Sequence, residues 1–86
     1  MDRLQIREAM LRTLHVAEEH AMDNCSSDSP MADYDHLLEM FNSTSTEQDV
    51  GKLNRYLGWM QCAVYCHGNG EIDLEVFKEI NRRVQE

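Results

Sequence analysis

The chain has 86 residues, 42% of them hydrophobic, and its 16 Asp and Glu against 8 Lys and Arg give a net charge of −8. This length predicts a single domain over residues 1–86, and the negative charge argues against direct binding to nucleic acid. No apolar run approaches the roughly 20 residues that cross a bilayer, the charged start MDRLQIREAM does not fit a signal peptide, and three cysteines cannot all pair in a disulfide framework.

Apolar residues at steps of three and four predict a first helix over residues 2–22. Its stripe consists of Ile6, Met10, Leu14, Ala17 and Ala21. Ser29 followed by Pro30 is a typical helix start, with Ser as the cap and Pro in the first turn. A second helix is therefore predicted over residues 30–42. Its stripe consists of Tyr34, Leu37, Leu38 and Phe41.

The third helix is predicted over residues 46–66, after a capping box formed by Ser45 and Gln48. Its apolar stripe consists of Val50, Leu53, Leu57, Met60 and Val64. Gly51 and Gly58 lie inside this helix, where each costs about 1 kcal/mol relative to Ala. Two such residues favour close approach by another backbone, either within the fold or from a partner.

The segment GNGEID predicts a turn between the third helix and a fourth over residues 74–84. Gly68 stands where a left-handed residue commonly ends a helix, and Asp73 stands at the N-cap of the next one. Ile72 and Phe77 flank this cap at the spacing of a hydrophobic staple. The expected fold class is all-α, a small four-helix domain whose last two helices form an αα-hairpin.

The same segment resembles the second half of an EF-hand calcium loop when Gly70 is set at loop position 6. Asn69 and Asp73 then occupy ligand positions 5 and 9. Positions 1 and 12, where the EF-hand has carboxylates, are Tyr65 and Val76. We therefore reject an EF-hand and expect no metal here, because roles in a turn and a cap account for the same residues.

Cys62 and Cys66 lie one helical turn apart and are followed by His67, but no second Cys pair completes a zinc site. Because a helical cysteine most often behaves as a small buried hydrophobe, we expect both thiols to pack in the core. No nucleophile lies in a recognisable catalytic setting, and HGNG follows a helix rather than a strand, unlike a phosphate loop. The sequence predicts neither an enzyme nor a cofactor.

Two groups of residues are candidates for binding another protein. No Lys or Arg occurs between Thr13 and Gly51, so we expect an acidic face on the first two helices that attracts a basic partner. Its residues are Glu18, Glu19, Asp33, Asp35 and Glu39. The second group contains the aromatic and Arg types that most often anchor interfaces. Its residues are Arg55, Tyr56 and Trp59. The alternatives are that the carboxylates only confer solubility and that Trp59 packs beneath the first or second helix.

A pattern in small proteins encoded by bacteriophages and prophages resembles residues 52–82, KLNRYLGWMQCAVYCHGNGEIDLEVFKEINR. In that pattern an Arg-aromatic-Leu-Gly-aromatic-x-Gln helix precedes a turn and a helix that starts near Ile-Asp. The matching residues are Arg55, Tyr56, Leu57, Gly58, Trp59, Gln61, Ile72 and Asp73. The resemblance implies an accessory protein that binds a host protein and changes its activity, for example that of a nucleic-acid-processing or defence factor.

We therefore expect a reduced protein in the cytoplasm of the host cell, whose partner is a host protein with a basic surface, and not nucleic acid or a membrane. Two alternatives stay open. One is an oligomeric structural or assembly protein with Gly51 and Gly58 at a helix–helix contact. The other is a metal-responsive protein that uses the turn between the third and fourth helices.

Overall fold

Four α-helices make up most of the computed structural model, which describes residues 1–24 and 30–86. They are α1 (Arg3–Glu19), α2 (Tyr34–Ser43), α3 (Val50–Gly68) and α4 (Leu74–Arg83). Short 3-10 turns lie between them: η1 (Met22–Asn24), η2 (Pro30–Ala32) and η3 (Thr44–Thr46). These residues contain no strand, so the predicted all-α class is confirmed. Within the same residues, no helix combines the length and the apolar character that crossing a bilayer requires.

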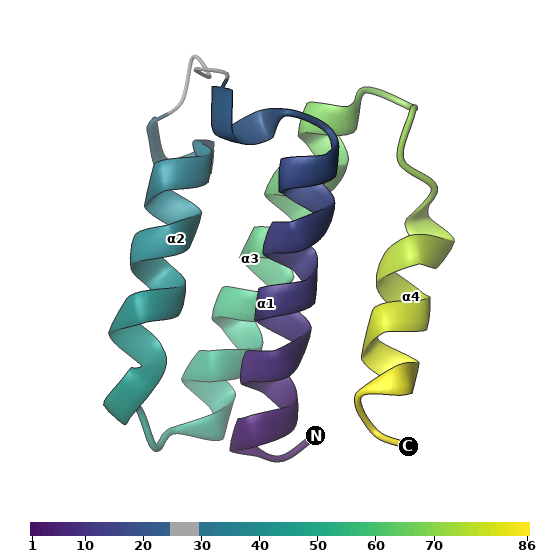
Figure 1. Cartoon of the computed structure of the whole chain (residues 1–86). Helices are drawn as coiled ribbons and strands as arrows, with labels where there is room; N and C mark the ends of the chain where they lie inside the picture. Colours follow the sequence, from purple (N-terminus) through teal and green to yellow (C-terminus); the bar gives the residue numbers. More distant parts are fainter. Residues whose placement is uncertain (25–29) are drawn as a thin grey trace.

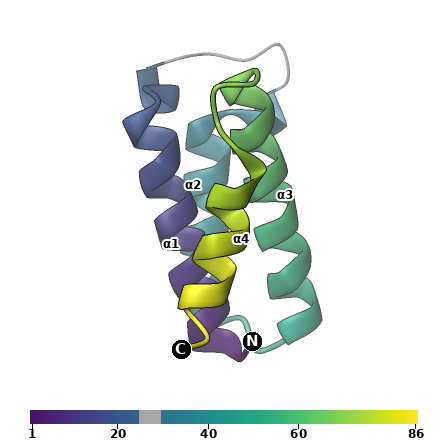
Figure 2. The same cartoon turned by 90° about the vertical axis from the view of Figure 1, so that its right-hand side faces the viewer.

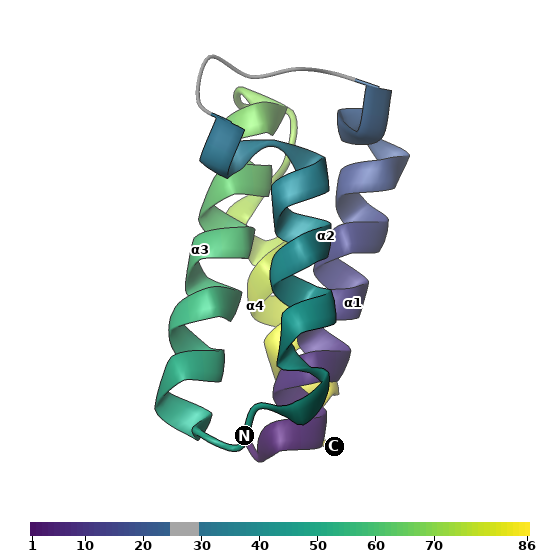
Figure 3. The same ribbon diagram turned by 90° about the vertical axis from the view of Figure 1, so that its left-hand side faces the viewer.

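α1 and α3 form the central pair of the fold and run in the same direction (Figure 1). Figure 2 shows α4 in front, flanked by α1 and α3, and Figure 3 shows α2 on the opposite side of this pair. α2 and α4 both run against the central pair, and the two termini lie at the same end of the molecule. α3 and α4 thus form the predicted αα-hairpin, while α2 and α3 lie side by side and border the surface described below.

Apolar side chains from all four helices meet in one buried core. α1 and α3 supply most of it, because their predicted stripes face each other. Its fully buried large members include Ile6, Met10, Leu14, Leu37, Leu53, Met60 and Val64. Val50 and Ala21 were predicted for these stripes but are exposed, since Val50 starts α3 and Ala21 lies beyond the end of α1.

The boundaries of the first two helices differ from the prediction. α1 ends at Glu19 because Ala21 adopts a left-handed backbone conformation, with φ of 58°, which directs the chain into η1. α2 begins at Tyr34 with Asp33 as its N-cap, and Pro30 starts the separate turn η2 instead. The predicted cap Ser29 lies outside the described residues.

The capping box predicted for the third helix is wrong. Ser45 lies in the 3-10 turn η3, and α3 begins four residues later than expected, at Val50. Asp49 is the N-cap, and its carboxylate accepts hydrogen bonds from two backbone N–H groups of the first helical turn at 2.9 and 3.3 Å. A charged cap of this kind satisfies donors that would otherwise lack partners.

The turn between α3 and α4 places the left-handed residue one position later than predicted. Gly68 is the last residue of α3, and Asn69 has φ of 47° and ψ of 48°, followed by Gly70 with φ of 90°. Gly68 is needed for a different reason, because a Cβ atom added there would lie 2.6 Å from Cγ1 of Ile72. Asp73 caps α4 as predicted, since its side chain accepts a hydrogen bond from a first-turn backbone N–H at 2.9 Å.

No other backbone approaches the two remaining helical glycines within the described fold. No described atom outside the helix lies within 4 Å of a Cβ added at Gly58. Around a Cβ added at Gly51, only the side chains of Asp49 and Arg55 lie within that distance. The expectation of a close contact inside the fold is therefore wrong, and a contact with a partner stays a prediction.

Candidate protein-binding surface

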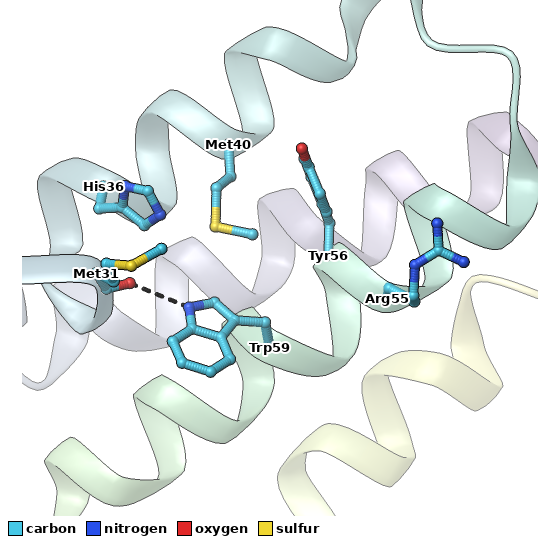
Figure 4. A pocket seen from close by; sticks show the side chains of 6 residues that line it. All are labelled: Met31, His36, Met40, Arg55, Tyr56 and Trp59. Atoms are coloured by element: carbon cyan, nitrogen blue, oxygen red, sulfur yellow. Dashed lines mark hydrogen bonds between the residues drawn. The ribbon is translucent and has the colours of Figure 1, made fainter.

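A groove of about 350 Å³ lies between α2 and α3. η2 and α2 contribute Met31, His36 and Met40, and α3 contributes Arg55, Tyr56 and Trp59 (Figure 4). Two thioethers and two large aromatic rings give the groove a surface that is mainly apolar. Methionine side chains adapt to partners of different shape, which is why they recur at binding surfaces.

Trp59 occupies the centre of this surface and is held in place. Its indole N–H donates a hydrogen bond to the backbone carbonyl of Met31 at 3.0 Å (Figure 4). Trp59 is nevertheless 45% exposed, and Met31 is 59% exposed. Trp59 therefore contacts η2 without being covered by it, so the alternative in which it packs beneath a helix is wrong.

The three residues of the predicted aromatic and Arg patch line this one groove. Tyr56 is half-buried and lies beneath the Lys52 ammonium group, which is 5.6 Å from the ring centroid. Arg55 is exposed, lies at the end of the row farthest from Met31, and forms no ion pair with the residues described. It is the one guanidinium or ammonium group among the residues that line the groove.

The opposite wall of the groove was not identified from the sequence. Met31, His36 and Met40 are 19 to 28 positions away from Trp59 along the chain, and only the arrangement of α2 next to α3, both packed on α1, brings them to it. His36 and Met40 lie one helical turn apart, beside rather than on the apolar stripe of α2. This spacing is the one feature of the sequence that could have identified His36 and Met40 as neighbours on one face of α2.

The predicted acidic residues lie on α1, on α2 and at the N-cap position before α2. Glu18 and Glu19 lie at the end of α1, Asp33 is the N-cap of α2, and Asp35 and Glu39 lie one turn apart on α2. Asp33 is half-buried, whereas the other four are exposed. The Tyr34 hydroxyl donates to Glu18 Oε1 at 2.5 Å, which joins the α1 and α2 portions of this face.

Negative charge is balanced on α4 but not on α2. Arg82 and Arg83 both donate hydrogen bonds to Glu79. These bonds lower the pKa of the Glu79 carboxyl to about 2, and the bond from Arg82 has the larger effect. Asp35 and Glu39 form no ion pair with any residue that the structure describes. The outer face of α2 therefore keeps its full negative charge.

This charged face of α2 borders the groove. Successive residues of an α-helix are separated by about 100° around its axis. Leu37 points into the core, so Asp35 and Glu39 point outward while Met40 and His36 lie toward α3. The carboxylates of Asp35 and Glu39 thus lie on the outer face of α2, next to the face of that helix that lines the groove.

The expectation that both cysteines are buried is wrong. Cys62 and Cys66 are free and exposed on α3, because Met60 and Val64 point into the core and Cys62, two positions after Met60, points about 200° away from it. Partial desolvation is the main cause that raises the pKa of Cys62, and the neighbouring thiol of Cys66 raises it further.

Among residues 1–24 and 30–86, no three His, Cys, Asp or Glu side chains gather as a metal site would require.

Tyr34 predicts a specific dependence of stability on pH. The pKa of Tyr34 is raised from 10.0 to about 12, mainly by partial burial and secondly by its hydrogen bond to Glu18. The folded state therefore keeps a proton that the unfolded state loses first, so this contribution to stability is complete below pH 10 and is lost as pH rises toward 12. Between pH 10 and 12, the free energy of unfolding measured with urea should fall more steeply with pH for the natural chain than for Tyr34→Phe. An equal fall with pH in the two proteins would contradict the role of the Tyr34 hydroxyl.

A scan against protein-family models, a search of curated proteins and a search of solved structures each find no match to this chain.

Proposed function

We propose that this protein is a small acidic accessory protein of the phage type, which acts by binding a basic surface of a host protein. The observation that carries the proposal is that α2 presents two exposed carboxylates, Asp35 and Glu39, without an ion pair among the described residues, while its neighbouring face lines a groove with the half-exposed Trp59. Such a surface supplies both parts of a protein interface, an aromatic anchor and a charged rim. The resemblance of residues 52–82 to phage proteins supports the same proposal.

The charge determines which partners are favoured. The net charge of −8, which equals the net charge of residues 1–49, attracts positively charged partners and disfavours acidic ones. Host proteins that handle nucleic acid carry basic surfaces, so an acidic protein bound there would block their activity. We include inhibition of a nucleic-acid-processing or defence factor in the proposal for this reason.

Affinity capture from the native host tests the proposal. The double variant with Asp35→Lys and Glu39→Lys should bind the captured basic protein at least about tenfold more weakly. Binding of this protein to the natural chain should weaken as the salt concentration rises. Glu71→Lys with Glu86→Lys is the matched control, because it changes the net charge equally at exposed positions away from the groove. Asp33 is left unchanged because it is half-buried at the N-cap position of α2. Equal loss of binding in both double variants, or in neither, would refute the proposal.

Self-association is a second candidate function, favoured by one observation. The outer face of α3 at Gly58 is open, since no atom of residues 1–24 or 30–86 outside the surrounding helix lies within 4 Å of a Cβ added there, so a second helix has room to approach closely. Light scattering at high protein concentration tests this. A dimer that Gly58→Leu disrupts would support an assembly role, and a monomer would exclude it.

A further inference from the structure

The groove beside Trp59 has the form of a helix-binding surface. Its side chains form a row that starts at Met31 of η2 and continues along α3 through Trp59 and Tyr56 to Arg55 (Figure 4). An elongated apolar surface between two neighbouring helices accommodates the apolar face of a third helix, as in other helix-in-groove complexes. We propose that this groove binds a basic amphipathic helix of the partner protein, an inference that rests on the proposed function above.

The charges on the two edges of the groove define the partner helix further. The outer face of α2, next to the groove, carries the exposed carboxylates of Asp35 and Glu39. The α3 side carries the exposed guanidinium of Arg55 and, over the Tyr56 ring, the ammonium group of Lys52. A bound helix therefore places Lys or Arg over α2 and an uncharged or acidic residue beside Arg55. A second copy of this chain is a poorer fit, because its own charge of −8 would bring carboxylates against carboxylates.

The apolar residues of the groove explain how such a helix would be held. The hydrogen bond from Trp59 to the Met31 carbonyl fixes the indole before binding, so little conformational entropy is lost at the anchor. Met40 is half-buried and points from α2 toward α3, where its flexible thioether can adjust to the entering side chain (Figure 4). The groove therefore combines a rigid centre with an adaptable wall.

A synthetic helix provides the probe. The peptide has 18 residues, with Leu at i, i+3, i+4 and i+7 spacing, Lys elsewhere and no aromatic residue, so the emission of Trp59, the one Trp in the chain, reports the groove alone. We expect saturable binding with a shift in Trp59 emission. A peptide of the same composition in scrambled order should bind at least about tenfold more weakly, because it has the charge without the apolar face.

Variants of the chain test each part of the surface. Met40→Gln should weaken peptide binding severalfold, whereas Leu11→Gln, at a 37%-exposed position on α1, should not. Glu39→Lys should weaken binding of the Lys peptide and strengthen binding of the same peptide with Glu in place of Lys. Arg55→Glu should tighten binding of the Lys peptide, since it removes a repulsive charge. Circular dichroism confirms that each variant is folded.

Several outcomes would overturn the inference. They are equal binding of the ordered and scrambled peptides, no effect of Met40→Gln, or a Trp59 emission that changes with protein concentration alone, which would place a second copy in the groove. If Met40→Gln left binding of the captured host protein intact while reversal of Asp35 and Glu39 abolished it, this inference would fail and the proposed function would stand. If neither reversal nor Met40→Gln affected the captured protein, the proposed function itself would fail.

Discussion

Gly68→Ala is expected to destabilise the protein, whereas Gly58→Ala is expected to stabilise it, although both glycines lie in the same helix. A Cβ at Gly68 would lie 2.6 Å from Cγ1, 2.7 Å from Cδ1 and 3.0 Å from Cβ of Ile72, which is itself buried. Overpacking of this kind costs about 1–3 kcal/mol, which outweighs the gain of up to about 1 kcal/mol from replacing a helical glycine. At Gly58 no described atom outside the surrounding helix lies within 4 Å of an added Cβ, so only the gain applies.

Urea unfolding of the two variants measures the difference. Ile72→Val removes the Cδ1 methyl group, so it should recover part of the loss in a Gly68→Ala background while destabilising the natural chain. A stabilising Gly68→Ala would show that Ile72 moves aside at little cost, and it would contradict the close packing of the turn against α3.

Gly68 illustrates what the sequence could and could not predict. The pattern GNGEID predicts a helix end, a turn and a new cap at Asp73, and the structure has all three. The assignment of the left-handed residue to Gly68 was wrong because Asn69 also tolerates that conformation. Only the position of Ile72 over the end of α3 explains why glycine is needed at 68, and a contact between side chains is not visible in a local pattern.

The candidate binding surface shows the same division between what the sequence predicts and what only the structure reveals. Residue type and helical spacing identified Arg55, Tyr56 and Trp59 as a candidate patch, and these three line one groove. The other wall depends on which faces of α2 and α3 meet, and this is set by the packing of both helices on α1. Periodicity within each helix does not contain that information, so Met31 and Met40 were missed.

Arg3→Ala is expected to lower the free energy of unfolding by about 2–3 kcal/mol, a large effect for an arginine near a chain end. The Arg3 guanidinium donates to the Glu47 carbonyl at 2.6 Å, to the Thr44 carbonyl at 3.4 Å and also to the Ser45 carbonyl. These carbonyls lie just beyond the end of α2, in and directly after η3, where a positive charge is favourable. One side chain therefore fastens the connection between α2 and α3 to the start of α1.

The matched control is Arg12→Ala, also on α1. Arg12 pairs with Glu8 at 3.0 Å, and both side chains are largely exposed, so the expected loss is below about 0.5 kcal/mol. Arg3→Lys should recover only part of the stability, because one ammonium group cannot reproduce the planar fork that reaches three carbonyls. Since Arg3 fixes the end of α2, Arg3→Ala should also loosen Met40 and shift the emission of Trp59 under conditions in which the protein remains folded. Equal losses for Arg3→Ala and Arg12→Ala, with unchanged emission, would show that the α2–α3 connection holds its position without this contact.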